Sequence, residues 1–240
     1  MDAGQRSHLS RRKFSVEFHP YQPPAKLILP ISYRASGWKI LAFLLLTTIG
    51  AVAQSAFFLP VREAIVSVPD QKIVVMEGTR KLATFPVSTS KFGTGDRRNS
   101  WSTPMGSLRV AQKIGDHVPP GGVFRRRQVT GEILQPNAPG RDPIVTRILW
   151  LTGNEPNNRN AYERCIYIHG TTEEKFIGKP ASFGCIRMKS KDVIVLYEML
   201  SVGSQITIVP EKVGKAVESF AMAKLQPMQM GAVSISNPQE

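Results

Sequence analysis

Beyond residue 60 the chain alternates between short apolar runs rich in β-branched residues and polar connections. Apolar runs of about four to eight residues, bounded by turn-forming residues, are typical of β-strands. The connections at 88–104, 115–122 and 136–143 are rich in the small, polar, Gly and Pro residues that favour loops. The pattern therefore predicts strands at 64–68, 72–76, 81–88, 107–112, 146–152, 164–169 and 205–209.

One segment, residues 191–200, follows a helical pattern instead. Ser190 is a suitable N-cap, and Gly203 follows the expected end of the helix. Its apolar residues recur three and four positions apart, which predicts one buried face made of Val193, Leu196, Tyr197 and Leu200.

Many short strands with one prominent helix predict a mainly β domain. We expect a β-sandwich or flattened barrel over residues 64–210. Residues 211–240 are polar and Met-rich, and we expect a flexible tail there.

Residues 38–59 form a long apolar run in which Lys39 is the only charge. About twenty such residues suffice to cross a bilayer as a helix. Basic residues predominate before this run, so the positive-inside rule places residues 1–37 in the cytoplasm and the chain after Pro60 outside. The alternative is a cleaved signal peptide with an apolar core at 40–50. Both interpretations export the rest of the chain.

The formal charge of +13 raises the possibility of nucleic-acid binding. The positive charge is scattered, however, and its densest run, 125–127, lacks the interleaved aromatic residues that stack on bases, so we expect no nucleic-acid partner. A basic surface also suits other polyanions, such as a bacterial cell wall or phospholipid headgroups. With only Cys165 and Cys185, a disulfide scaffold is excluded, and at most one bridge is possible.

The residues able to carry chemistry lie between Tyr167 and Met188. His169 and Gly170 end a predicted strand, and Cys185 follows them within a Ser-Phe-Gly-Cys-Ile-Arg-Met run. A thiol becomes an efficient nucleophile when a base converts it to a thiolate. We therefore expect His169 to take the proton of Cys185 and then to hold the thiolate as an imidazolium.

The residues around this pair are predicted to bind the substrate. Gly184 allows close approach of a substrate, and the backbone N–H groups of Gly184 and Cys185 are candidate oxyanion donors. Arg187 offers a planar fork for a substrate carboxylate. The predicted substrate-binding set is Ser182, Phe183, Gly184, Arg187 and Tyr167.

Other interpretations of these residues stay open. Cys185 could be an inert buried cysteine, or it could form a structural disulfide with Cys165. A metal site is disfavoured because a strand at 164–169 would separate Cys165 from His169 by about 13 Å. Of the other histidines, His8 and His19 precede the apolar run and His117 lies in a loop, which leaves His169 as the candidate base.

These motifs resemble the catalytic signature of the L,D-transpeptidase family (the YkuD-type domain). Its pattern is His-Gly, a similar gap, and then Ser-His-Gly-Cys-Ile/Val-Arg-Met/Leu. The resemblance extends to the Thr-Pro-Met-Gly segment at 103–106 and to the strand at 85–88, and it covers about residues 65–210. It implies that Cys185 is the nucleophile, His169 is its base and the Gly170 carbonyl holds the imidazole. Phe183 stands where the family usually has a histidine.

The resemblance also implies a reaction. The thiolate attacks the carbonyl of the third residue of a peptidoglycan stem peptide, releases the terminal D-residue and passes the acyl group to an amine, which forms a cross-link. No metal or organic cofactor is implied. Together with residues 38–59, it implies a single-pass inner-membrane protein with a periplasmic catalytic domain, or a periplasmic protein if the segment is cleaved. An L,D-carboxypeptidase or amidase, and a non-catalytic wall-binding module, are the alternatives.

Overall fold

The computed structural model describes the backbone of residues 61–233 and the side chains of residues 61–225. The predicted cytoplasmic tail (1–37) and apolar segment (38–59) lie outside these residues. Within residues 61–233, no helix combines the length and apolar character needed to cross a membrane.

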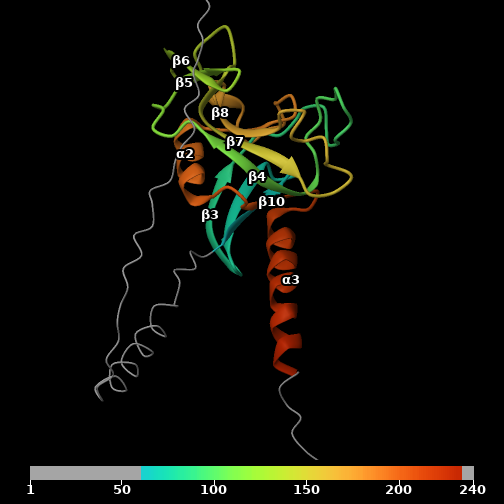
Figure 1. The fold of residues 1–240 in the computed structure, drawn as a ribbon. Coiled ribbons are helices and arrows are strands. Elements are labelled where there is room, and N and C mark those ends of the chain that lie inside the picture. Colours follow the sequence, from blue (N-terminus) through green and yellow to red (C-terminus); the bar gives the residue numbers. More distant parts are fainter. Residues whose placement is uncertain (1–60, 234–240) are drawn as a thin grey trace, which may run out of the picture. The chain divides into compact units, whose positions relative to one another are not determined.

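The described chain is mainly β (Figure 1). Its strands are β1 Arg62–Ser67, β2 Lys72–Glu77, β3 Arg80–Pro86, β4 Gly106–Ile114, β5 Gly122–Arg125, β6 Gln128–Ile133, β7 Ile144–Gly153, β8 Tyr167–Thr171, β9 Ile186–Met188 and β10 Gln205–Val209. Its helical elements are a short 3₁₀ turn, η1 Glu174–Phe176, and the helices α2 Ser190–Met199 and α3 Val213–Val233.

Hydrogen bonds join these strands into one sheet with the order β3-β2-β1-β10-β4-β7-β5-β6, and β8 and β9 extend from β7. Most neighbouring strands are antiparallel. The pairs β1–β10 and β8–β9 are parallel. The expectation of a mainly β domain is therefore confirmed, with all strands of the described region joined in one continuous sheet. The choice between a β-sandwich and a flattened barrel stays a prediction.

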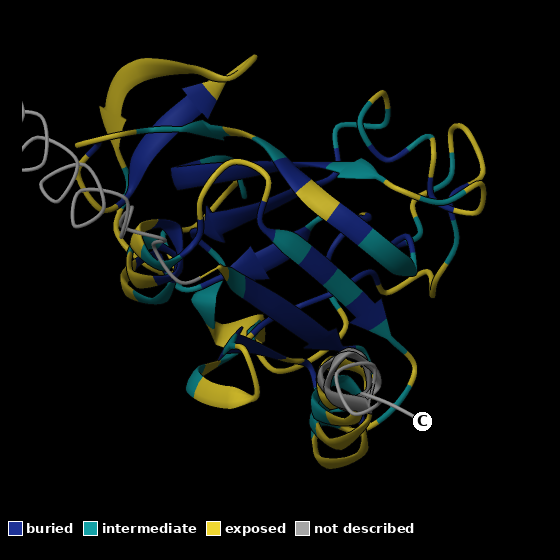
Figure 2. Cartoon of the chain, turned by 60° about the horizontal axis from the view of Figure 1, so that its bottom comes forward, coloured by how far each residue is buried: buried dark blue, intermediate teal, exposed yellow. Residues whose placement is uncertain are grey.

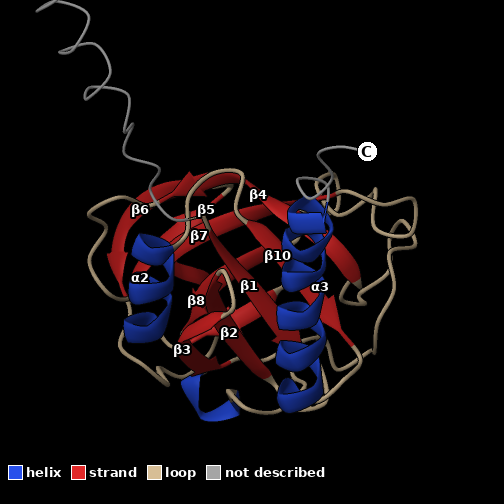
Figure 3. Ribbon diagram, turned by 90° about the horizontal axis from the view of Figure 1, so that it is seen from below, coloured by secondary structure: helices blue, strands red, loops and turns tan. Residues whose placement is uncertain are grey.

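The central strand β1 is buried on both faces, since its residues alternate between two clusters. Ala64 and Val66 belong to the main core, to which α2 contributes Val193, Leu196 and Tyr197. Ile65 faces the other side of the sheet and packs with α3. Figure 2 shows the central strands mostly buried, and exposed residues on loops, on outer helix surfaces and on an outlying strand; β6 is exposed along its whole length. Figure 3 shows α2 and α3 against the strands.

The structure has a second long helix, which the sequence analysis did not predict. A single prominent helix and a flexible tail after residue 210 were expected, but α3 occupies residues 213–233. Val213, Ala216, Val217 and Phe220 pack against β1 and β2. This packing contributes to the stability of the helix, because most helical stability in proteins comes from tertiary packing of one apolar face.

The strand predicted at 164–169 is displaced. β8 begins at Tyr167, and Cys165 lies in the preceding turn with a φ of 56°. A positive φ is incompatible with an extended strand, so Cys165 does not alternate with the residues of β8. The premise that Cys165 and His169 share a strand is therefore wrong.

Candidate active site

The parallel pairing of β8 with β9 brings the two motifs of the sequence together. His169 is in register with Arg187, and Ile168 with Ile186. Both isoleucines are fully buried in the main core. Since side chains alternate along a strand, His169 points to the opposite face, and so does Cys185, which directly precedes β9. The two residues are diagonal neighbours, with Cα atoms about 7–8 Å apart by ordinary sheet geometry.

The imidazole of His169 is held by the backbone. Its Nδ1 lies 2.8 Å from the carbonyl oxygen of Gly170. A carbonyl only accepts hydrogen bonds, so Nδ1 carries the proton and Nε2 keeps its lone pair. Gly170 is required at this place, because a Cβ there would lie 2.6 Å from the carbonyl oxygen of Val145 on β7.

The thiol of Cys185 rests on the backbone before β8. Its Sγ donates to the carbonyl oxygen of Cys165 at 3.4 Å and accepts the N–H of Tyr167 at 3.4 Å. The hydrogen bonds of the described residues include none between Cys185 and His169. The two side chains therefore share a face of the sheet, and the thiol is hydrogen-bonded to the backbone before β8 instead of to the imidazole.

Burial favours the neutral form of both groups. Burial raises the pKa of the Cys185 thiol to about 11, although the N–H of Tyr167 and the charge of Arg187 oppose the shift. Burial lowers the pKa of His169 to about 4. Each environment disfavours the charged form, so the resting arrangement favours the neutral pair over the thiolate–imidazolium pair expected from the sequence.

The turn that presents Cys185 is rigid. Ser182 Oγ donates to the Cys185 carbonyl at 2.5 Å and accepts the Gly184 N–H at 3.2 Å. Thr103 Oγ1 donates to the Gly184 carbonyl at 3.0 Å. Gly184 has a φ of 117°, and a Cβ there would lie 3.3 Å from the Ser102 carbonyl. Since Ser182 engages the Gly184 N–H, that group is not a free oxyanion donor.

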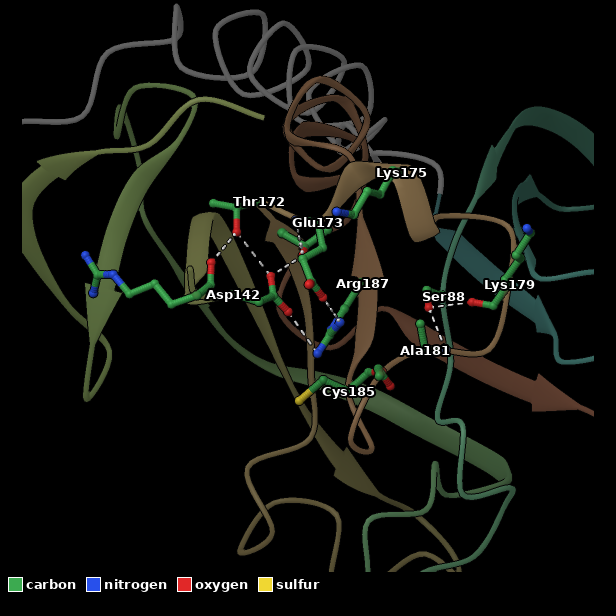
Figure 4. A network of polar contacts seen from close by, with 12 residues as sticks. Ser88, Asp142, Thr172, Glu173, Lys175, Lys179, Ala181, Cys185 and Arg187 are labelled. Atoms are coloured by element: carbon green, nitrogen blue, oxygen red, sulfur yellow. Dashed lines mark hydrogen bonds and ion pairs between the residues drawn. The ribbon is translucent and has the colours of Figure 1, made fainter. Parts of the chain in front are cut away.

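Arg187 does not hold its fork open for a substrate. Its Nη2 pairs with Asp142 at 2.8 Å and its Nη1 with Glu173 at 3.3 Å (Figure 4). Asp142 in turn accepts hydrogen bonds from the hydroxyl groups of Thr171 and Thr172. The role of carboxylate receptor predicted for Arg187 is therefore corrected to that of a buried ion-pair centre.

The acidic partners of Arg187 were missed by sequence reasoning. A signal for them existed, because Arg187 stands between the apolar residues Ile186 and Met188, and a guanidinium that becomes buried needs an acidic partner. The pattern does not say which acid supplies the charge.

Phe183 is half exposed and lies in an aromatic cluster. Its ring centroid is 5.6 Å from that of Phe92 and 5.8 Å from that of Trp101. Phe183 and Arg187 also line a cavity of about 440 Å³, together with residues 137–142, Glu173 and Lys175. The cavity thus has an aromatic edge and a charged wall.

Tyr167, the remaining predicted substrate-binding residue, is buried. Its hydroxyl accepts a hydrogen bond from Arg127 Nη1 at 3.3 Å. Cys165 and Cys185 are both free, so no disulfide joins them. In residues 61–225, no group of three or more His, Cys, Asp or Glu residues is arranged to hold a metal ion.

This chain is similar to a known protein family over a region that includes its catalytic motifs. The model of the L,D-transpeptidase catalytic domain (YkuD) matches residues 62–208. Two putative L,D-transpeptidases of Bacillus subtilis (strain 168) are similar: YkuD is 51% identical over 41 residues, and YqjB is 37% identical over 62 residues. These stretches are 17% and 25% of this chain, and they span only 25% and 35% of the two relatives.

Solved structures give weaker likenesses. An L,D-transpeptidase from Mycobacterium smegmatis has a TM-score of 0.39 and 17% identity, covering 62% of this chain and 58% of that one. An L,D-transpeptidase from Xylanimonas cellulosilytica (residues 123–326) has a TM-score of 0.41 and 15% identity, covering 66% and 68%.

Proposed function

The chain belongs to the L,D-transpeptidase (YkuD) family of enzymes, whose catalytic-domain model matches residues 62–208, and we propose that it is a cysteine L,D-transpeptidase acting on peptidoglycan stem peptides. The observation that carries the proposal is the pairing of β8 with β9. It places His169 and Cys185 on one sheet face, with Nδ1 of the imidazole engaged by Gly170 and Nε2 left for the thiol.

The reaction begins from the neutral pair. Rotation about the Cα–Cβ bond of Cys185 carries the sulfur from the Cys165 carbonyl towards His169. Nε2 takes the thiol proton as the sulfur attacks the carbonyl carbon of the third stem residue. Because both charged forms are disfavoured at rest, the proton moves only when the developing charge passes to the substrate oxygen.

The tetrahedral intermediate then collapses. The N–H of Cys185 is the oxyanion donor in this scheme, since Ser182 already engages that of Gly184. The carbon–nitrogen bond to the terminal D-residue breaks, and the His169 imidazolium returns the proton to the leaving amine. A thioester on Cys185 remains. An acceptor amine attacks it and His169 takes the amine proton. The carbon–sulfur bond then breaks as the imidazolium passes that proton to the sulfur, which restores the thiol.

The test is to incubate the purified full chain with a stem tetrapeptide and follow both protein and peptide by mass spectrometry. We expect an acyl adduct on Cys185, lost in Cys185→Ala, and a cross-linked peptide product. A tripeptide without cross-links would indicate the hydrolytic alternative, an L,D-carboxypeptidase, in which water takes the place of the amine. No adduct in the wild type would contradict the proposal.

A non-catalytic wall-binding module is the second candidate. It is favoured by one observation, the neutral thiol that rests on a backbone carbonyl. Such a module would bind purified peptidoglycan without forming an adduct, and Cys185→Ala would bind as tightly as the wild type.

We further propose that residues 38–59 anchor the domain in the inner membrane and place it in the periplasm. The support is the length and apolar character of this segment and the basic residues before it. Fractionation of bacteria expressing the full chain tests this. Release from membranes by detergent but not by alkaline carbonate is expected. A mature N-terminus after Ala53 would indicate a cleaved signal peptide instead.

A further inference from the structure

The proposed reaction releases a D-residue with a free carboxylate, and the site needs a cation to recognise it. Arg187 cannot supply the fork, because Asp142 and Glu173 already engage it. A second guanidinium, that of Arg127, lies on the same side of the sheet and is free of acidic partners among the described residues.

Arg127 comes from the tip of the β5–β6 hairpin. The two residues between the strands, Arg126 and Arg127, both have positive φ, 51° and 67°. Two central residues with positive φ are typical of the two-residue turns whose twist matches that of the strands. This turn places the Arg127 side chain over Trp150 of β7, with the guanidinium carbon 4.6 Å from the ring centroid.

The aromatic residues beneath Arg127 pack closely on one another. Trp150 stacks on Tyr162 with ring centroids 4.1 Å apart and meets Tyr167 edge-on at 5.6 Å. A guanidinium over an indole face is attracted by the ring's quadrupole and keeps its N–H groups in its own plane, pointing outward. Nη1 donates to the Tyr167 hydroxyl at 3.3 Å, so the other edge of the guanidinium keeps its donors.

Arg127 and Cys185 contact the same two residues. Arg127 Nη1 lies 3.9 Å from Cys165 Sγ and 3.3 Å from the Tyr167 hydroxyl. Cys185 Sγ lies 3.4 Å from the Cys165 carbonyl oxygen and 3.4 Å from the Tyr167 backbone nitrogen. The Cys185 thiol and the Arg127 guanidinium are therefore separated only by Cys165 and Tyr167.

From this geometry we propose that Arg127 binds the carboxylate of the terminal residue that the reaction releases. Trp150 and Tyr167 position the guanidinium. The inference rests on the proposed function for its substrate. In that substrate, the terminal carboxylate lies about 4 Å from the scissile carbonyl carbon, one peptide unit away. A carboxylate at this distance from Cys185 falls within reach of a long arginine side chain, and the bidentate pair fixes the direction of the peptide.

The test compares two stem tetrapeptides that differ only at the C-terminus, one with the free acid and one with a terminal amide. Each is offered to the full chain as wild type, Arg127→Ala, Arg127→Lys and Arg125→Ala. Arg125 is the matched control, because it is an exposed arginine of the same hairpin and lines a separate depression with Arg126 and Val129.

We expect the wild type to acylate Cys185 about 10- to 100-fold faster with the acid than with the amide, in kcat/KM, which is the range of a charge-assisted hydrogen bond. Arg127→Ala should lower kcat/KM for the acid peptide to the value for the amide peptide, and should leave kcat/KM for the amide peptide unchanged. Arg127→Lys should retain part of the preference, and Arg125→Ala all of it. Equal losses on both peptides in Arg127→Ala, or none on either, would overturn the inference.

A binding measurement separates this inference from the proposed function. Cys185→Ala cannot be acylated, so calorimetric titration of this variant with the two peptides reports recognition alone. We expect the acid peptide to bind Cys185→Ala more tightly than the amide peptide, and we expect this preference to disappear in the Arg127→Ala, Cys185→Ala double variant. That result supports carboxylate binding by Arg127 even where the wild type forms no adduct. If the wild type forms the adduct and binding shows no preference, the inference fails and the proposed function stands.

Discussion

Arg187 and Asp142 form an ion pair of 2.8 Å that joins β9 to the loop before β7. Their side chains are only 10% and 13% exposed. The pair lies next to the strand that carries His169, and Thr171, two residues further along β8, donates to the same carboxylate. A buried charge that loses its partner destabilises the folded state strongly, so this contact holds the strand geometry on which the site depends.

Asp142→Asn is expected to lower the free energy of unfolding by about 2–4 kcal/mol, because Glu173 alone then faces the buried guanidinium. Urea denaturation measures the change. The matched control is Glu132→Gln, which removes the exposed ion pair with Arg141 and should change stability by less than about 1 kcal/mol. Equal effects of the two substitutions would contradict a structural role for the buried pair.

The alkylation of Cys185 should depend on pH as that of a thiol whose pKa is raised, not lowered. With a pKa of about 11, the thiolate fraction and the rate with iodoacetamide increase about tenfold per pH unit from 7 to 10. Cys165→Ala leaves Cys185 as the single thiol in the measurement. His169→Ala should leave the profile unchanged, since the resting thiol is hydrogen-bonded to the backbone of Cys165 and Tyr167 instead of to the ring. A rate that is already constant at pH 8 would indicate the thiolate expected from the sequence.

Stability should fall on acidification through the titration of His169. Burial lowers the pKa of this residue from 6.5 to about 4, so its neutral form favours the folded state. Its contribution is fully present above pH 6.5 and is lost as the pH falls towards 4, at up to about 1.4 kcal/mol per pH unit. His169→Gln should show a correspondingly flatter dependence in denaturation at several pH values. His117→Gln, which removes an exposed histidine, should match the wild type.

Gly184→Ala tests the turn that presents the nucleophile. The substitution introduces both backbone strain at a φ of 117° and a Cβ 3.3 Å from the Ser102 carbonyl. Gly178→Ala introduces strain alone, at a φ of 95°, because nothing lies within 4 Å of its Cβ. Both should lower stability by about 1–3 kcal/mol. Only Gly184→Ala should also slow formation of the Cys185 adduct, and an equal slowing in Gly178→Ala would argue against the close approach.

Several elements could be predicted from the sequence because they are local. The strand at 205–209 and the helix at 191–200 follow from periodicity, and the observed elements differ from them by at most one residue at either end. β6 was missed because it has only two large apolar residues, Val129 and Ile133, and all its residues are exposed. The α3 helix was missed although Val213, Ala216, Val217 and Phe220 repeat at helical spacing, which a fuller search for periodicity would have found.

Some features of the candidate site could likewise be predicted from the sequence, and others could not. The sequence predicted that His169 and Cys185 lie close enough for proton transfer, and the structure places them on one face of the sheet. The neutral state of both groups was not, because it depends on burial by residues distant in sequence. The ion pair of Arg187 with Asp142 and the position of Arg127 over Trp150 likewise depend on strand register, and no local pattern predicts that register.

The parallel pairing of β1 with β10 has a consequence for the order of folding. Ala64 pairs with Ile206, so the first described strand finds one of its two neighbours only when the last strand has been made. Until then, β1 and the hairpin behind it present an open edge that can pair with other chains. Contacts so distant in sequence also form slowly. Synthesis of this protein therefore includes an interval in which most of the polypeptide exists but the middle of its sheet does not, and a chaperone that covers that edge would raise the yield of native molecules.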